Sequence, residues 1–300
     1  MDPGAGAVPG GSRLAVVGDV AVDYYLEVAA GSGDEKATAV RSLRTLGGTG
    51  ANAAVAAARL GSRVELYSAV GDDPYGPWLR EQLTARGVDT SGVRTLPGHS
   101  THATILLRDG SRQVIVDRGV GDRLGDVVPD TLAAATIYVS YAPAAVVALA
   151  AAEYGDRTVV GLEAWMVTEH GLREALPAVR LVVTNAAGWQ ALSQVGAPVG
   201  VPVVETRGGD GSVLHEPGGG EVSVAAYPVD VVDPTGAGDC YAGALCHYLD
   251  TGVDLVAACR LASAAAALST RAYGAQAGLP TEAEVRAAAR VHPTSNGRPT

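Results

Sequence analysis

The heptad DPTGAGD, residues 233–239, combines residue types that bind an anion with one that can accept a proton. Its glycines expose backbone N–H groups where the small-residue run 236–249 predicts a long helix, and such a helix end binds phosphate without a lysine. Phosphate would repel the carboxylate of Asp239 in the first turn, so a general base is a better interpretation than a purely structural charge. We therefore predict Asp239 as the base beside an anion hole, whose amides belong to Thr235, Gly236, Ala237 and Gly238.

A second glycine cluster, GGTGANA at residues 47–53, opens a helix predicted over 50–60. One interpretation is the G-x-G-x-x-A turn of a dinucleotide-binding fold, with Glu65 as the acid that binds ribose. The preceding segment 40–46 carries arginines in alternation, however, whereas the first strand of that fold is buried on both faces. The alternatives are a tight turn without a ligand, and bare backbone lying against a polyhydroxyl substrate while Asn52 offers its carboxamide to hydroxyl groups.

Composition excludes several functional classes. The 300-residue chain is 47% hydrophobic and has a net charge of −10, without a basic cluster, which argues against nucleic-acid binding. Its apolar runs are too short for a membrane span. The only lysine in the sequence, Lys36, cannot complete a Gly-Lys-Ser/Thr phosphate loop. Cysteines without CxxC spacing and a start without a signal-peptide layout predict a cytoplasmic protein.

The surrounding segments predict where these clusters lie. Short apolar runs alternate with helical patterns and predict a mostly parallel sheet, covered by helices on both faces; these runs are 13–18, 136–140, 158–162, 181–184 and 203–206. Segments within 20–46 and 102–118 alternate apolar with polar residues, which predicts a small second sheet. Ligands bind beyond the carboxyl ends of parallel strands. We expect one domain over 13–290, between disordered tails at 1–12 and 291–300.

Two segments resemble the signatures of the PfkB carbohydrate kinase family, which has the ribokinase-like fold. They are GGTGANAAVAAARLGSRVELYSAVGDDPYG at 47–76 and DPTGAGDCYAGAL at 233–245, and the tail STRAYGAQAGLP at 269–280 is similar to the family's closing segment. The resemblance spans roughly residues 13–290. It implies a three-layer α/β/α sandwich with a mostly parallel central sheet and a small β-sheet lid. It also implies transfer of the γ-phosphoryl group of ATP to an alcohol, with magnesium.

The resemblance further implies roles for individual residues. Asp239 matches the family's catalytic base, and residues 236–238 match its anion hole. The positions that match substrate-binding residues are Asp23, Gly47, Gly48 and Asn52. The positions that match ATP-binding residues are Asn185, Thr206, Gly208, Gly211 and Ser263. Backbone carbonyls near Asp233, Thr235, Ser269 and Gly274 resemble a potassium site. The lid strands, within 20–46 and 102–118, would exclude water and, as in relatives, pair two subunits into a homodimer.

The chain departs from the family pattern at three positions. Gly188 stands where the family usually has the glutamate of Asn-x-x-Glu, which puts magnesium binding or full activity in question. Ala21 and Thr49 replace an asparagine and a lysine of the ribokinase pattern, which disfavours ribose. The opening GDVAVDYY resembles that of bacterial heptose-phosphate kinases. A phosphate on such a substrate would need a basic partner, for which the candidates are Arg112, Arg118 and Arg123.

We therefore expect an ATP-dependent kinase that acts on a small-molecule sugar or sugar derivative. A nucleoside kinase is the alternative, in which Tyr24 or Tyr25 could stack on the base, although packing within the lid is the expected role of both. Glu163 follows a predicted strand and is a further candidate for the surroundings of the metal. The change at Gly188 also leaves open a protein that binds ligand without transferring phosphate. The presence of Asp239 argues against it, because a binding protein needs no base.

Overall fold

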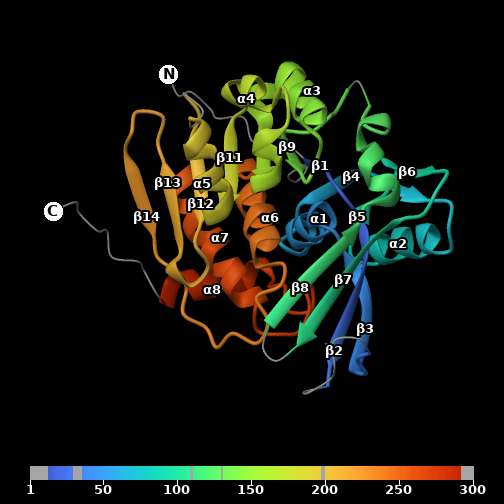
Figure 1. Ribbon diagram of the computed structural model, residues 1–300. Helices are drawn as coiled ribbons and strands as arrows, with labels where there is room; N and C mark the ends of the chain where they lie inside the picture. The colour runs from blue at the N-terminus through green and yellow to red at the C-terminus, as the bar shows by residue number, and fades with distance from the viewer. Residues whose placement is uncertain (1–12, 30–35, 109–110, 130, 197–199, 292–300) are drawn as a thin grey trace.

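The computed structural model of the chain describes residues 13–29, 36–108, 111–129, 131–196 and 200–291. Within these residues, a ten-stranded sheet runs through the middle of the molecule in the order β14-β13-β12-β11-β10-β9-β1-β4-β5, with β6 also paired to β4 (Figure 1). Its pairs are parallel except at the β12–β13–β14 edge. The strands are β1 (Arg13–Val17), β4 (Arg63–Gly71), β5 (Val88–Asp89), β6 (Val93–Leu96), β9 (Thr136–Ser140), β10 (Thr158–Leu162), β11 (Leu181–Asn185), β12 (Val203–Thr206), β13 (Ser212–His215) and β14 (Glu221–Val224).

Helices cover both faces of this sheet. Side chains alternate along a strand, so Leu14 and Val16 of β1 face one core and Ala15 and Val17 face the other. The first core includes α1, α2, α6, α7 and α8, and the second includes α3, α4 and α5. The predicted three-layer α/β/α sandwich is confirmed. The helices are α1 (Thr49–Arg59), α2 (Tyr75–Thr84), α3 (Ala144–Tyr154), α4 (Leu172–Ala175), α5 (Ala186–Val195), α6 (Ala237–Asp250), α7 (Leu255–Ser269) and α8 (Glu282–Val291).

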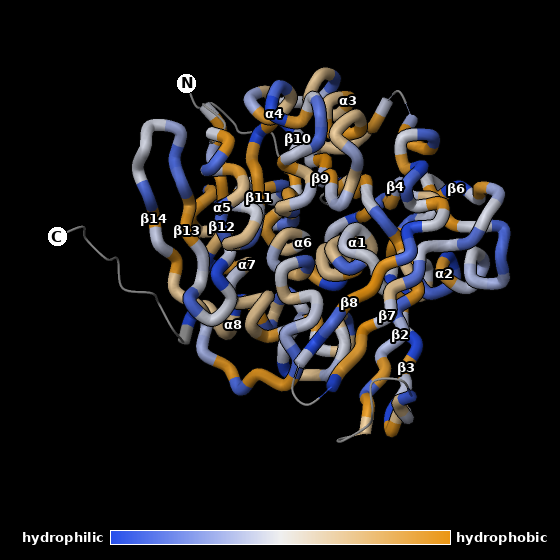
Figure 2. Tube along the Cα trace, in the orientation of Figure 1, coloured by the Kyte–Doolittle hydropathy of each residue, from blue (hydrophilic) through white to orange (hydrophobic). Residues whose placement is uncertain are grey.

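Four strands form a separate small sheet that projects past one end of the large sheet (Figure 1). This confirms the second sheet predicted from the alternation of apolar and polar residues. They lie in the order β3-β2-β7-β8. Tyr25, Ala103 and Ile105 form a core of its own on one face, and apolar stretches along β7 and β8 stand out in Figure 2. The strands are β2 (Ala21–Val28), β3 (Ala39–Gly47), β7 (Thr101–Arg108) and β8 (Ser111–Asp117).

Helices α1 and α6 approach each other closely at Gly243. A Cβ atom on Gly243 of α6 would overlap the carbonyl oxygen of Ala53 in α1. At the start of α1, a Cβ on Gly50 would lie 2.7 Å from the Cα of Gly18, just beyond β1. Gly243 thus brings α6 close to α1, and Gly50 brings the first turn of α1 against the carboxyl end of β1, where ligands of parallel sheets bind.

The predicted disordered ends, 1–12 and 291–300, lie outside the described residues, except that α8 reaches Val291. None of the helices in the described ranges is long and apolar enough to cross a membrane.

Candidate active site

Asp239 and Asn52 meet between the first turns of α6 and α1. The side-chain N–H of Asn52 donates to the Asp239 carboxylate over 2.8 Å. Gln276 donates to the carbonyl oxygen of Asn52 over 2.9 Å, and so turns the Asn52 amino group toward Asp239. Desolvation raises the pKa of Asp239 well above its ordinary value, and the bond from Asn52 partly offsets that rise. A raised pKa favours uptake of a proton by this carboxylate, as a general base requires.

The predicted substrate-binding residues come together at the start of α1. The carboxyl group of Asp23 lies against Gly47, where any Cβ would overlap it. Gly48 follows with a φ of 95° as the N-cap residue of α1, which carries Asn52 in its first turn. Burial raises the pKa of Asp23 to about 7. The negative charge of Asp19 adds to this rise, and the positive charge of Arg112 reduces it. Bare backbone and hydrogen-bonding side chains thus line one place, as a polyhydroxyl ligand requires.

Hydrogen bonds within the chain engage two of the four amides predicted for the anion hole. The Thr235 N–H donates to the Asp233 carboxylate over 2.9 Å, and the Ala237 N–H donates to the Pro234 carbonyl over 3.2 Å. In the described part of the chain, the amides of Gly236, Gly238 and Asp239 donate to no acceptor. A Cβ on Gly238 would meet no atom within 4 Å. The amides of Thr235 and Ala237 thus donate within the turn, whereas those of Gly236, Gly238 and Asp239 have no acceptor there, and the anion hole over residues 235–238 stays a prediction.

A cavity of about 410 Å³ adjoins this end of α6. Ala237 and Gly238 form part of its wall, and apolar residues such as Val229 and Ala266 form much of the rest. A mostly apolar cavity next to a helix end with free amides suits a nucleotide, whose base is flat and whose phosphates are charged. Its wall also contains four of the five positions expected to bind ATP, namely Thr206, Gly208, Gly211 and Ser263.

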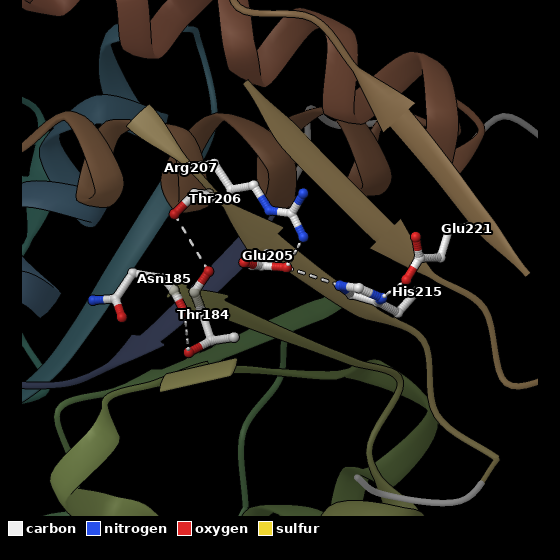
Figure 3. A network of polar contacts seen from close by, with 7 residues as sticks. All are labelled: Thr184, Asn185, Glu205, Thr206, Arg207, His215 and Glu221. Atoms are coloured by element: carbon white, nitrogen blue, oxygen red, sulfur yellow. Dashed lines mark hydrogen bonds and ion pairs between the residues drawn. The ribbon is translucent and has the colours of Figure 1, made fainter. Parts of the chain in front are cut away.

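A polar network holds the loop that leads from β12 into this cavity (Figure 3). The buried carboxylate of Glu205 accepts from Arg207 over 2.7 Å and contacts His215 over 3.0 Å. Burial alone would raise the pKa of Glu205, but these two partners lower it below its ordinary value. The indole of Trp189 stacks on His215 with ring centroids 3.8 Å apart. The network therefore fixes the end of β12, and with it the position of Thr206 and of the following glycines in the cavity wall.

Asn185, the fifth expected ATP-binding residue, caps α5 instead of lining the cavity. Its side chain accepts from the Gly188 N–H over 2.9 Å and donates to Glu163 over 3.4 Å. A Cβ at position 188 would overlap the hydroxyl of Thr184, so a glutamate there would displace this packing. The Glu163 carboxylate lies beside the Asn185 amide, and burial raises its pKa. A carboxylate therefore still lies beside the Asn185 amide, but it is that of Glu163, which directly follows β10, and not one at position 188.

Three of the four positions of the predicted potassium site are tied together by one carboxylate. Asp233 accepts from the Thr235 amide and hydroxyl, and from the Gly274 N–H over 2.8 Å. These hydrogen bonds outweigh the effect of burial and lower the pKa of Asp233. The carbonyl of Ser269, the fourth position, lies against Gly278. No group of three or more acidic, histidine or cysteine side chains in the described residues could hold a metal ion.

The small sheet and segment 232–235 enclose a second cavity of about 720 Å³. Tyr25 and Arg112 line it from the sheet. Tyr24 faces away, because its hydroxyl donates to that of Tyr75 over 2.6 Å and its ring stacks on His102. Tyr24 therefore packs where the small sheet meets α2, whereas Tyr25 packs on Ala103 and Ile105 and also lines the cavity.

Reasoning from the sequence missed two residues of this arrangement. Asp19 accepts the Gly50 N–H over 3.0 Å and so anchors α1 to the end of β1. Asp19 directly follows the first predicted strand, and this position at the carboxyl end of a parallel strand could have identified it as a site residue. Gln276, which orients Asn52, is 224 residues away from it in sequence. Only its place in the closing segment hinted at a role.

Comparison with known proteins places the chain in a family. The family model described as pfkB family carbohydrate kinase matches residues 12–282. The chain is 32% identical to a ribokinase of Bacillus subtilis over 80% of this chain and 86% of that protein. It is 28% identical to a nucleoside kinase of Methanothermobacter thermautotrophicus, over 90% of this chain and 93% of the relative. The crystal structure of a ribokinase from Thermotoga maritima has the same fold, with a TM-score of 0.81 and 22% identity over 93% of this chain and 99% of that one. The chain therefore belongs to the pfkB family of carbohydrate kinases, enzymes that transfer phosphoryl groups to an alcohol.

Proposed function

We propose that the protein transfers the γ-phosphoryl group of ATP to a hydroxyl group of a sugar or sugar derivative, with Asp239 as the general base. One observation carries the proposal. The Asp239 carboxylate, oriented by Asn52, stands at the helix end where unpaired amides and the 410 Å³ cavity meet. A group that accepts a proton and a group that binds phosphate are therefore neighbours, which is the arrangement that phosphoryl transfer requires.

In the reaction, Asp239 takes the proton of the hydroxyl group as its oxygen forms a bond to the γ-phosphorus of ATP. The bond between that phosphorus and the bridging oxygen breaks, and ADP leaves with the electron pair. The amides of Gly236, Gly238 and Asp239 donate to the oxygens of the group in transfer. Asp23 and Asn52 hold the sugar hydroxyls, so that the attacking oxygen is already aligned.

Magnesium would neutralise charge on the phosphates of ATP when it is bound. The Glu163 carboxylate, which accepts from the Asn185 amide, would supply an oxygen ligand of the kind that magnesium prefers, and this ion needs few protein ligands because it retains water. We also propose the carbonyls around Asp233, Thr235, Ser269 and Gly274 as a potassium site.

A nucleoside is the alternative acceptor, since a relative that is 28% identical is a nucleoside kinase. A free sugar is favoured because Tyr24 is held against Tyr75 and His102, away from the 720 Å³ cavity, which leaves Tyr25 as the one tyrosine of the pair that lines it. Ribose remains disfavoured, since Ala21 and Thr49 lack the groups that contact it in the ribokinase pattern.

The small sheet is proposed as a lid that closes over the acceptor and excludes water. It also exposes apolar side chains, which supports a homodimer formed through the lids. They are Val40, Leu43, Val114, Ile115 and Val116. Free, buried cysteines, namely Cys240, Cys246 and Cys259, support a reducing compartment such as the cytoplasm.

The test is a screen of neutral sugars, sugar acids, sugar phosphates and nucleosides with ATP and magnesium, with and without potassium. ADP release is measured together with the mass of each acceptor. The proposal expects at least one sugar or sugar derivative to gain the mass of one phosphoryl group. If only nucleosides are phosphorylated, the sugar is wrong as the acceptor and the protein is a nucleoside kinase.

A further inference from the structure

His215 is the last residue of β13, and both nitrogens of its ring face a carboxylate (Figure 3). Its Nε2 lies 3.0 Å from the carboxylate of Glu205 on β12. Its Nδ1 lies 3.1 Å from the carboxylate of Glu221, the residue directly opposite on β14. A neutral imidazole has one N–H and can donate to only one of these acceptors, whereas the imidazolium cation donates to both. The geometry therefore fits the charged form of His215.

The elements packed against this ring also favour a positive charge on it. Glu205 is a buried carboxylate whose pKa lies below its ordinary value, so it carries a negative charge that needs positive partners. The indole of Trp189 on α5 covers one face of the His215 ring, with 13° between the ring planes, and an aromatic face attracts a cation. Helix α5 carries no charged side chain of its own. The charged groups that this geometry brings to His215 are therefore Glu205, Glu221 and, through its bond to Glu205, Arg207.

The same network holds the loop that lines the 410 Å³ cavity. The guanidinium of Arg207 binds Glu205 over 2.7 Å, and the Arg207 backbone N–H closes the loop by donating to the Gly211 carbonyl over 2.7 Å. A Cβ on Gly211 would overlap the carbonyl oxygen of Val224, so the loop also packs on the end of β14. His215 thus joins the two strands, β12 and β14, between which the loop is held. Four loop residues line the cavity, namely Thr206, Gly208, Gly209 and Gly211.

We propose that charged His215 is a positioning residue for the nucleotide, which holds the loop of residues 206–211 in the shape that lines the cavity, and that loss of its proton weakens nucleotide binding. This inference rests on the proposed function, since it takes the 410 Å³ cavity as the ATP site. His215 touches no ligand itself and acts through the ends of β12 and β14.

The direction of the pH dependence follows from the two carboxylates. Histidine is the side chain that ordinarily changes charge between pH 5 and 8. The neutral ring keeps one N–H, so its other nitrogen turns a lone pair toward a carboxylate and repels it. Glu205 is enclosed, with 4% of its side-chain surface exposed, whereas 63% of the Glu221 side chain is exposed. The neutral ring therefore stays on Glu205 and releases Glu221, which loosens β14 and the loop, so nucleotide affinity falls as pH rises.

The experiment measures the binding of ADP with magnesium by calorimetry, from about pH 5.5 to about pH 8.5. It compares wild type with His215→Phe, which keeps a ring on Trp189, and with Glu221→Gln, each checked for folding by thermal melting. ADP titrates in this range too, so each affinity is divided by that of His215→Phe at the same pH. This ratio should fall about 3- to 10-fold from acid to alkaline pH for wild type.

Glu221→Gln is the sharper variant, because the replaced side chain is exposed and its loss does not threaten folding. A neutral His215 can donate to Glu205 and at the same time accept from the new amide, so the affinity ratio should stay constant across pH. The matched control is Glu216→Gln, which replaces an exposed acid in the turn between β13 and β14. It should show the same fall as wild type.

Nitrogen NMR of the His215 ring, assigned by its loss in His215→Phe, reports the charge directly, and the amide signals of Gly208, Gly209 and Gly211 should shift over the same pH range. A ring whose charge does not change in this range, or an affinity ratio for wild type that does not depend on pH, would overturn the proposal. Parallel assays of phosphoryl transfer separate the two claims. A pH-dependent ratio that Glu221→Gln abolishes, without phosphorylation of any acceptor, supports the role of His215 and contradicts the kinase proposal. Phosphorylation of an acceptor with a constant ratio does the reverse, and a wild type that binds no ADP at any pH contradicts both.

Discussion

At the scale of single residues, the proposed chemistry depends on how Asn52 faces Asp239. An amide can present either its oxygen or its amino group, and only the amino group can donate to a carboxylate. Gln276 settles the choice, because it donates to the Asn52 oxygen and also to the Leu46 carbonyl, over 3.3 Å. Gln276 is therefore a positioning residue, which acts on the proton acceptor through Asn52.

We expect Gln276→Leu to lower kcat about tenfold while the KM for ATP stays close to that of wild type. Without a fixed Asn52, Asp239 loses a bond that lowers its pKa, so the acid limb of the rate profile should move to higher pH. Steady-state rates across pH test this, with the exposed Gln190→Leu on α5 as the control. An unchanged acid limb would contradict the positioning role.

Asp23 should oppose folding at neutral and higher pH. Its pKa is about 7 in the folded protein against 3.8 for the ordinary group, so the folded state binds more protons between these values and stability falls as pH rises through them. Asp23→Asn should therefore stabilise the protein more at about pH 8 than at about pH 5, and the difference in unfolding free energy should be up to ~3 kcal/mol.

Asp233→Asn is the matched control for that experiment, with the opposite sign. Hydrogen bonds lower the pKa of Asp233, so its stabilisation is present at neutral pH and lost as pH falls through the lowered value. Its replacement should reduce stability more at about pH 8 than in acid. The same pH dependence for both variants would contradict the assigned charge states.

At the scale of elements, the glycine clusters and the alternation of strands and helices were sufficient to predict both sheets and the helix starts that carry Asn52 and Asp239. These features are local in sequence. The partners of those residues are not local, which is why Gln276 was missed and Glu163 was only a candidate. The two engaged amides at Thr235 and Ala237 depend on the detailed turn geometry of segment 233–237, which residue types alone do not specify.

The contact between α1 and α6 gives a test at this scale. We expect Gly243→Ala to destabilise the protein by about 1–3 kcal/mol, because the added methyl overlaps the Ala53 carbonyl and forces the helices apart. Activity should fall as well, since α1 carries Asn52 and α6 carries Asp239. Denaturation and kinetics measure the two effects. Gly218→Ala, where a Cβ meets no atom within 4 Å, should change neither.

At the scale of the whole molecule, the small sheet is the proposed interface with a second copy of the chain. Val114 and Val116 keep 45% and 40% of their surface exposed on β8, at the outer edge of this sheet. A net charge of −10 keeps copies apart in general, so association would depend on this apolar surface.

The proposed homodimer predicts a particle of twice the chain's 30.2 kDa. Val114→Lys should convert it to a single chain, because a charge would be buried in the interface. Light scattering after size exclusion measures the mass. Leu149→Lys on α3, which places a lysine at an equally exposed apolar position outside the small sheet, should leave the dimer intact. A monomeric wild type would refute the dimer without affecting the proposed chemistry.

The central claim is that Asp239 is the base for phosphoryl transfer to a hydroxyl group. The most direct measurement is the rate of phosphorylated acceptor formation by Asp239→Asn, with Asp254→Asn, a replacement at the start of α7, as the control. The account predicts a loss of about 10²- to 10⁴-fold for Asp239→Asn with ATP binding retained, and no loss for the control. An Asp239→Asn enzyme that phosphorylates the same acceptor at the wild-type rate would contradict it.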